Sequence, residues 1–174
     1  MFDKSTDVEV LLHTKRFDVV RKSDPKSEGK ARSREIVVHP GAAVILPILD
    51  DQHVVMIRNT RLAVGQELWE LPAGTLDPGE QPIETARREL EEETGYRAES
   101  FTPLGTFFTS PGVMNEVMHV FVATQLSRGK QDLDDGEKIK VEIVELARAR
   151  RMLTNLELRD GKSIATLGLF FLRQ

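Results

Sequence analysis

The stretch that decides the fold is GTLDPGEQPIETARRELEEETGY, residues 74–96 of the 174-residue chain. A turn rich in glycine and proline opens it. A helix is predicted from Pro82, a favoured first-turn residue, to a stop at Gly95. Apolar residues at spacings of three and four would form the stripe of this helix that faces the core. That stripe consists of Ile83, Ala86 and Leu90.

Glutamates crowd the second half of the predicted helix. Glu89, Glu92 and Glu93 stand at positions i, i+3 and i+4, so they share one helix face. Like charges at this spacing repel by a few tenths of a kcal/mol per pair. Two interpretations are open: a solvated acidic face, or a site for a hard divalent cation such as Mg2+ or Mn2+, which takes oxygen ligands.

The spacing around these glutamates resembles the signature of the Nudix hydrolases. Gly74, Glu80 and the run RELEEETGY (residues 88–96) stand at the distances of that signature, with tyrosine at position 96 where an aliphatic residue is commoner. The resemblance implies an α/β fold, the Nudix α/β/α sandwich with a mixed β-sheet. It also implies an enzyme in which water attacks a phosphorus of a nucleoside diphosphate linked to another group.

The resemblance assigns roles residue by residue. The metal ligands would be the backbone carbonyl of Ala73 and the carboxylates of Glu89, Glu92 and Glu93, and Glu92 is also a catalytic candidate. The structural positions of the signature would be Gly74, Glu80, Arg88 and Gly95. Mg2+, or Mn2+ as the alternative, would bridge protein and substrate and lower the pKa of a bound water.

A second motif narrows the resemblance to one branch of the family. The loop SPGVMNE (residues 110–116), with its proline 16 residues after Gly95, resembles the ADP-ribose and nucleoside-diphosphate-sugar pyrophosphatases. Within this branch Glu116 would be a general base or a residue beside the metals, and Arg61 would contact phosphate. The remaining substrate-binding candidates are Glu35, Ser110 and Gly112. For Glu116 and Arg61 the alternative is an ordinary surface residue.

Three positions depart from the branch and leave the substrate open. Asn59 replaces a glutamine, and Val113 and Met114 replace an aromatic and a hydroxyl side chain near the terminal sugar. We therefore expect cleavage of ADP-ribose or a related nucleoside diphosphate sugar into a nucleoside monophosphate and a sugar phosphate. GDP-mannose, another nucleoside diphosphate sugar, or a nucleoside triphosphate or oxidised nucleotide is the alternative. A non-catalytic nucleotide-binding regulator is disfavoured because every signature carboxylate is present.

The rest of the chain predicts mostly strands. Residues 8–20 predict one or two strands, and the polar stretch RKSDPKSEGKARSR (residues 21–34) predicts a loop. Two β-branched runs around Asp50–Gln52 predict a hairpin, and ELWELPAG (residues 67–74) predicts one short strand. Further strands are expected over 101–109, 116–126 and 138–146, and helices over 147–157 and 162–173. We predict an N-terminal β arm (1–38), which in this branch forms a homodimer, and a Nudix hydrolase domain (39–174).

Composition restricts the classes of function. The net charge of −4 does not suggest a nucleic-acid partner. The absence of cysteine excludes disulfides and a cysteine nucleophile, and the four histidines are scattered without metal-ligand spacing. No apolar run is long enough for a membrane span, and the first residues do not resemble a signal peptide. We expect a soluble cytoplasmic enzyme.

Overall fold

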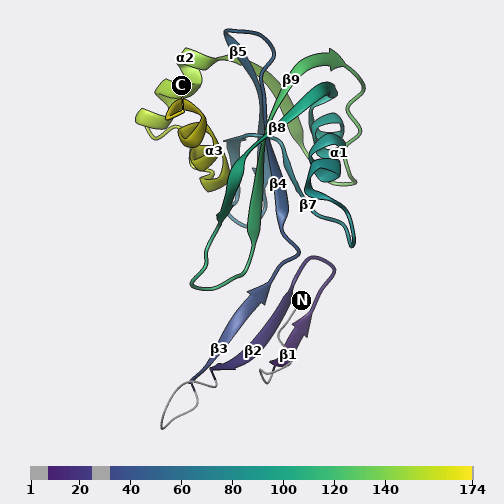
Figure 1. The fold of residues 1–174 in the computed structure, drawn as a ribbon, viewed down its shortest axis with the longest axis vertical. Helices are drawn as coiled ribbons and strands as arrows, with labels where there is room; N and C mark the ends of the chain where they lie inside the picture. Colours follow the sequence, from purple (N-terminus) through teal and green to yellow (C-terminus); the bar gives the residue numbers. More distant parts are fainter. Residues whose placement is uncertain (1–7, 25–31, 174) are drawn as a thin grey trace.

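The computed structural model describes residues 8–24 and 32–173, which form ten strands and three helices (Figure 1). Two sheets make up the body. Helix α1 (Pro82–Thr94) covers one side of them, and α2 (Leu146–Thr154) and α3 (Gly161–Phe171) cover the other. A third sheet projects from the body as an arm. This is the α/β/α sandwich with an N-terminal β arm that the sequence predicts.

The arm is an antiparallel sheet of three strands in the order β1-β2-β3. Its strands are β1 (Val8–His13), β2 (Asp18–Asp24) and β3 (Arg32–Val38). The prediction of a loop over 21–34 is therefore wrong at both of its ends, while 25–31 lie outside the described residues. Charged residues are tolerated in these strands because Arg21 pairs with Glu9 at 2.8 Å and Glu35 at 3.1 Å across both neighbouring strands.

The body contains one mixed and one antiparallel sheet. In the mixed sheet the buried strand β4 runs parallel to β9 and antiparallel to β7, and β8 closes the edge. Its strands are β4 (Ala42–Pro47), β7 (Ala73–Thr75), β8 (Tyr96–Phe108) and β9 (Val117–Arg128). The antiparallel sheet has the order β10-β5-β6. Its strands are β5 (His53–Arg61), β6 (Gln66–Glu70) and β10 (Ile139–Glu145).

Two strand predictions need correction. A turn does join β4 to β5, closed by an Ile48–Val54 bridge and by a 2.9 Å bond from Leu49 N to His53 O, but the two strands pair in different sheets. The segment 67–74 is likewise two strands, β6 and β7, which belong to different sheets. Both errors have one cause: strand patterns in a sequence show where strands lie and not which strands pair.

The core fills the space on both sides of β4. Ala86 and Leu90 of α1 are fully buried with Ala43 and Ile45, and full burial of such a leucine stabilises the fold by about 1.5–3 kcal/mol. On the other side lie residues of β5 and of both C-terminal helices, represented by Met56, Met152 and Leu167. Ile83, predicted to join the core, is instead 36% exposed near the start of the helix.

The ends of α1 are fixed by local chemistry, as the sequence predicts. Gln81, the N-cap, and Glu84 form a reciprocal capping box, and Pro82 between them occupies the first helical position. Gly95 ends the helix with φ of +70°, a conformation that strains any residue with a side chain. A Cβ at this glycine would also lie 2.9 Å from the backbone nitrogen of Gln131. The helix and the glutamates on it are thus held in one register.

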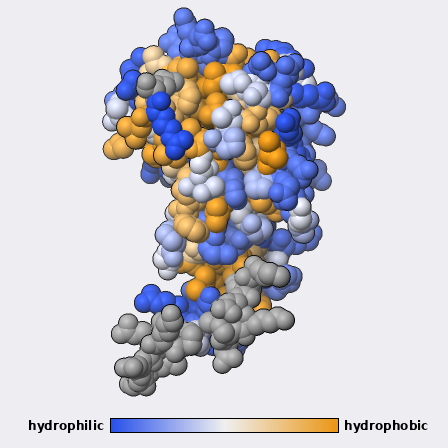
Figure 2. All heavy atoms as spheres, viewed as in Figure 1, coloured by the Kyte–Doolittle hydropathy of each residue, from blue (hydrophilic) through white to orange (hydrophobic). Residues whose placement is uncertain are grey.

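The arm exposes several apolar side chains to solvent. Val10, Leu12 and Phe17 are 60%, 52% and 37% exposed. Figure 2 shows hydrophobic surface where the arm meets the body, whereas hydrophilic residues cover much of the upper body. Over residues 8–24 and 32–173, no helix is both long and apolar enough to cross a bilayer.

Candidate active site

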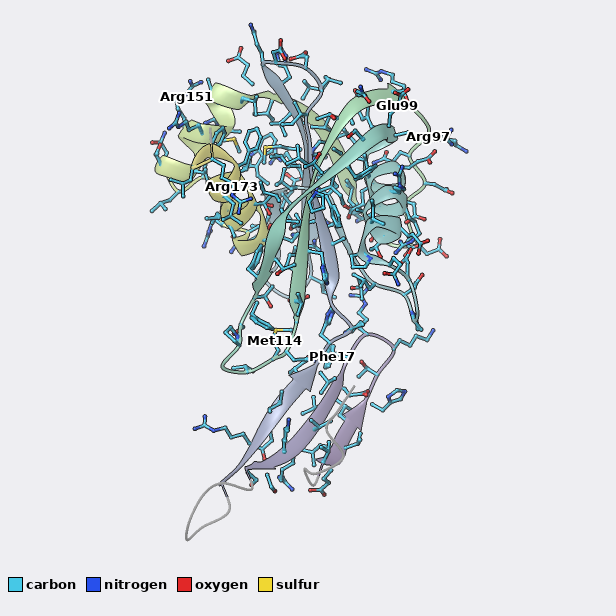
Figure 3. All side chains as sticks on the ribbon, viewed as in Figure 1. Phe17, Arg97, Glu99, Met114, Arg151 and Arg173 are labelled. Atoms are coloured by element: carbon cyan, nitrogen blue, oxygen red, sulfur yellow. The ribbon has the colours of Figure 1, made fainter. Side chains whose placement is uncertain are left out.

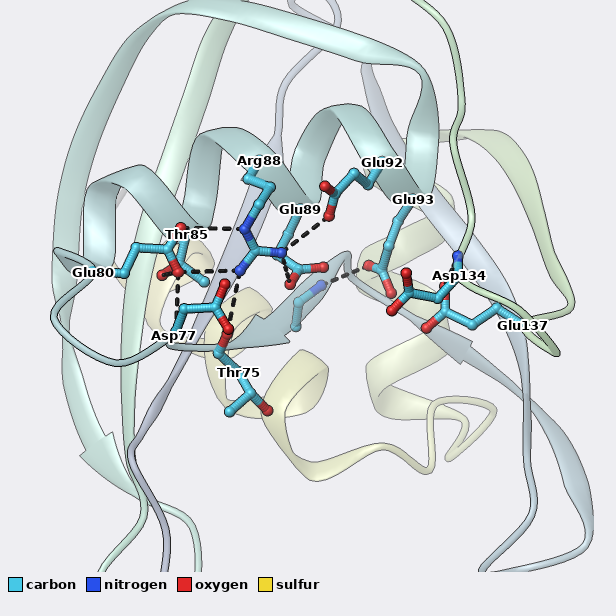
Figure 4. A network of polar contacts seen from close by, with 11 residues as sticks. Thr75, Asp77, Glu80, Thr85, Arg88, Glu89, Glu92, Glu93, Asp134 and Glu137 are labelled. Atoms are coloured by element: carbon cyan, nitrogen blue, oxygen red, sulfur yellow. Dashed lines mark hydrogen bonds and ion pairs between the residues drawn. The ribbon is translucent and has the colours of Figure 1, made fainter. Parts of the chain in front are cut away.

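The guanidinium of Arg88 is the centre of a polar network on α1 (Figure 4). It donates two hydrogen bonds of 3.1 Å to the carboxylate of Glu80, in the loop before the helix, and one of 3.3 Å to the carbonyl of Thr75. Its Nη1 donates to Glu89 at 2.6 Å and to Glu92 at 3.0 Å. The hydrogen bonds from Arg88 are the main reason that the pKa of Glu80 falls to about 2. Arg88 therefore ties the signature loop to the helix.

Glu93 and Glu89 lie buried against β7. The side chain of Glu93 accepts a 2.8 Å hydrogen bond from the backbone nitrogen of Ala73. Burial, and then the neighbouring charge of Glu89, raise the pKa of Glu93 to about 8 against the hydrogen bond from Ala73. Burial also raises the pKa of Glu89. Gly74 makes this approach possible, because a Cβ there would lie 1.8 Å from Glu89 Oε1.

These carboxylates line a cavity of about 390 Å³ together with Ala73. Three more acids, Asp132, Asp134 and Glu137, lie along the same cavity. Among the described residues no three acidic or imidazole groups already stand in a metal-binding arrangement, since Arg88 lies between Glu89 and Glu92. The donor set still fits a hard divalent cation, because it is made of carboxylate oxygens. The pKa values of Glu89 and Glu93 are raised, and a bound cation would lower them.

A second cavity of about 540 Å³ adjoins the first, because Arg61, Ala73, Gly74 and Thr75 line both. The fully buried carboxylate of Glu70 holds two cations at its wall. Arg61 donates to Glu70 from Nε at 2.8 Å and from Nη2 at 2.6 Å, and Lys162 of α3 donates to it as well. Lys162 also pairs with Asp160 at 3.0 Å.

Within this cluster, Glu70 and Arg61 each stabilise the charged form of the other. Burial opposes the charge of Glu70, but Arg61 and Lys162 outweigh it and hold the pKa of Glu70 below its ordinary value. The hydrogen bonds to Glu70 raise the pKa of Arg61 in turn. Within residues 8–24 and 32–173, Nη1 of Arg61 and one of the three N–H groups of Lys162 have no partner. The wall of the cavity can therefore donate hydrogen bonds to an anion.

Glu116 reaches the second cavity from the loop between β8 and β9. Its side chain is 16% exposed, and its Oε2 accepts a 2.6 Å hydrogen bond from the hydroxyl of Thr109. The structure thus brings Glu116 and Arg61 to connected cavities with the glutamates of α1. The cavities are not lined by Glu35, Ser110 or Gly112. Glu35 pairs with Arg21 on the arm, and the carbonyl of Ser110 accepts the backbone N–H groups of two later loop residues.

Sequence reasoning missed Glu70, Lys162 and Thr109. A charged residue beside Trp69 and Leu71, both apolar, was a sign that Glu70 is buried and needs a partner. Its partner Lys162 lies 92 positions later, and no local pattern connects the two. Asp160, which accepts from the backbone nitrogen of Ser163 at 3.0 Å, was recognisable as a helix N-cap.

Comparisons with known proteins show the family of this chain and the branch that it resembles. The NUDIX domain matches residues 38–167. An ADP-ribose pyrophosphatase of Bacillus subtilis (strain 168) is 39% identical over 92% of this chain and 88% of its own length. A GDP-mannose pyrophosphatase of Shigella flexneri serotype 5b (strain 8401) is 32% identical over 93% and 88% of the two chains. Among solved structures, an ADP compounds hydrolase superposes with a TM-score of 0.83 at 26% identity, over 96% of this chain and 91% of its own.

Proposed function

The chain belongs to the Nudix family and is a pyrophosphohydrolase resembling ADP-ribose pyrophosphatases, and from this premise we propose its substrate and its catalytic residues. The proposed reaction is the divalent-metal-dependent hydrolysis of ADP-ribose, or of a related nucleoside diphosphate sugar, to a nucleoside monophosphate and a sugar phosphate. One observation carries the proposal. Glutamates of α1, the cations Arg61 and Lys162, and Glu116 all line two connected cavities.

The metal-binding residues in this proposal are Glu89, Glu92 and Glu93 with the carbonyl of Ala73. Bound Mg2+ or Mn2+ would supply the positive charge that lets a diphosphate lie beside glutamates, and it would make a bound water more acidic. With a metal bound, Arg88 would give up its hydrogen bonds to Glu89 and Glu92. It would keep those to Glu80 and Thr75, which hold the helix and loop in place.

The other residues bind the diphosphate and move a proton. Arg61 and Lys162 line the cavity and would hydrogen-bond phosphoryl oxygens, for which a guanidinium is well suited. Glu116 would accept the proton as the water oxygen bonds to phosphorus and the bridging P–O bond breaks. The bridging oxygen leaves on the second phosphate, so one water is consumed for two phosphomonoesters.

A substrate panel tests the reaction. ADP-ribose, GDP-mannose, UDP-glucose and nucleoside triphosphates would be incubated with Mg2+, and released phosphomonoester measured after coupling to a phosphatase. We expect the nucleoside diphosphate sugars to be cleaved well and the triphosphates poorly. The likeness to a GDP-mannose pyrophosphatase favours GDP-mannose as the second candidate. A folded sample that cleaves none of the four would refute the proposal.

Two isosteric variants test the residues. Glu93→Gln should abolish turnover, and Glu116→Gln should lower kcat by about 10²–10⁴-fold if Glu116 is the general base. Glu99→Gln, on the exposed edge of β8 away from the site (Figure 3), is the matched control and should retain full activity. Activity within a few-fold of wild type for Glu116→Gln would remove it from the proposed mechanism.

We further propose a homodimer in which the arm (within residues 1–38) packs on a second copy of the hydrolase domain (39–174). The exposed Val10, Leu12 and Phe17 on the arm support it, because apolar patches of this kind mark interfaces. Glu35, which lies away from this chain's cavities, would then serve the partner's site. Sedimentation showing only a 19.6 kDa species at micromolar concentration would contradict the dimer.

A further inference from the structure

The loop Thr109–Glu116 joins β8 to β9 and is called here the β8–β9 loop. Within the loop, the carbonyl of Ser110 accepts hydrogen bonds from the backbone nitrogens of Val113 at 3.0 Å and Met114 at 2.9 Å. Residues 108–113 are exposed, and Val113 itself is 57% exposed. Apolar burial therefore contributes little to the position of this loop, and its hydrogen bonds must fix it.

Three of those hydrogen bonds run to the end of β3, where the arm joins the body. The backbone nitrogen of Val37 donates to the carbonyl of Val113 at 2.9 Å, and that of Asn115 donates to the carbonyl of Val37 at 3.2 Å. The side-chain Oδ1 of Asn115 accepts from the backbone nitrogen of His39 at 2.8 Å. Met114 of the loop also forms an isolated β-bridge with Val37 of β3, and Figure 3 labels Met114 in this loop. The loop is thus paired with the arm's last strand as well as with its own hairpin.

The carboxylate of Glu116 follows directly after this attachment. Its Oε2 accepts from the hydroxyl of Thr109, and its Oε1 lies 3.4 Å from Nδ1 of His39. That Nδ1 accepts a 3.1 Å hydrogen bond from the backbone nitrogen of Gly41, and no hydrogen bond joins it to Glu116 in the described part of the chain. Within residues 8–24 and 32–173 no donor reaches Oε1 of Glu116, which leaves this oxygen able to accept a proton at the cavity.

We propose that Asn115 is a positioning residue that acts through Glu116. Its side-chain oxygen fastens the β8–β9 loop to His39 at the arm–body junction, and the adjacent Cα of Glu116, about 3.8 Å along the chain, is fixed with it. This rests on the proposed role of Glu116 as general base. It also makes the arm part of the catalytic apparatus of its own chain, because β3 supplies the backbone to which the loop is bound.

The test compares kcat and KM of Asn115→Ala, Asn115→Asp and Asn155→Ala with wild type, using the diphosphate sugar that wild type cleaves best. Asn115→Ala should lower kcat about 3- to 10-fold, the factor expected for the net loss of one hydrogen bond. The Mg2+ concentration for half-maximal activity should not change. Asn115→Asp keeps an acceptor for His39 N and should recover most of the activity. Asn155, an exposed asparagine at the end of α2, is the matched control.

A double mutant decides whether Asn115 acts through Glu116. In the Glu116→Gln background, Asn115→Ala should have little further effect, because the group that it positions is already disabled. An equal loss in both backgrounds, or an Asn115→Ala enzyme within 1.5-fold of wild type while Glu116→Gln is strongly impaired, would overturn the inference alone. If Glu116→Gln itself stays within a few-fold of wild type, the proposed function of Glu116 fails and the inference falls with it. Thermal unfolding of each variant checks that it is folded.

Discussion

Replacing Glu93 by glutamine should stabilise the protein when metal is removed, although it should abolish activity. Glu93 is 4% exposed and lies beside Glu89, and its pKa is raised to about 8 from an ordinary value of 4.5. Folding of the metal-free protein must therefore suppress the ionisation of this carboxyl at neutral pH. Glutamine has the same shape, keeps an oxygen that can accept from Ala73 N, and never ionises.

The size of the effect follows from the two pKa values. In the unfolded chain, pH 7 lies about 2.5 units above the pKa of this glutamate, so it is ionised. In the folded protein, whose Glu93 pKa is about 8, the carboxyl is still mostly protonated at pH 7. At about 1.36 kcal/mol per pKa unit, the shift lowers the free energy of unfolding of wild type at pH 7 by up to about 3 kcal/mol. The glutamine variant does not suffer this loss. Because the folded pKa lies above the unfolded one, this loss grows as pH rises from about 4.5 to about 8. At pH 5 it should be below about 1 kcal/mol.

Urea unfolding in EDTA at pH 5 and pH 7 measures the difference. The control is Glu91→Gln, on the same helix, where the ion pair with Arg97 lowers the pKa and predicts the opposite sign. Saturating Mg2+ should then raise the stability of wild type but not of Glu93→Gln, because only wild type would bind the ion. A glutamine variant less stable than wild type in EDTA at pH 7, or a difference independent of pH, would refute the reasoning from buried charge.

Three further predictions concern the surroundings of the site. Glu70→Gln should lower the free energy of unfolding, measured by urea titration, by about 2–4 kcal/mol, because it removes a buried counter-charge from two cations. The control Glu67→Gln, at a more exposed ion pair, should lower it less. Gly74→Ala should raise the Mg2+ concentration for half-maximal activity by roughly 10-fold or more, measured by titration, because its Cβ displaces Glu89. Glu80, with a pKa near 2, gives stability that is present above pH 4.5 and lost as the pH falls. Wild type should lose about 1 kcal/mol more than Glu80→Gln between pH 5 and pH 3 in urea unfolding.

The parts of the fold that local chemistry determines were predictable from the sequence. The helix α1 was predicted between Pro82 and Gly95 because a favoured first-turn proline, an apolar stripe and a glycine stop all agree there. The strands were located, but the partners of β4 and β5 were not, since pairing depends on contacts between distant segments. The strand residues at 21–24 and 32–34 were missed because their polar sequence predicts a loop, and the pairing of β2 with β3, which joins Arg21 to Glu35, is visible only in the sheet.

The candidate site divides in the same way. The α1 glutamates share a face because of helical spacing, and their position on the helix follows from the sequence alone. Their chemistry depends on what faces them: β7 with the Ala73 backbone, and the strand–helix contact that joins Glu70 to Lys162. Neither contact leaves a periodic signal in the chain.

Electrostatics explains why those unpredicted partners are needed. Buried carboxylates repel and are poorly hydrated, so each must find a cation or a donor or lose its charge. Glu70 has Arg61 and Lys162, which hold its pKa low. In the described part of the chain, the Glu93 carboxylate accepts one hydrogen bond, from Ala73 N, and burial and Glu89 raise its pKa. The same chain thus contains one buried glutamate paired with cations from within and another that would need a cation from outside to carry its charge. That difference separates a carboxylate that supports the pocket from one that can hold a metal ion.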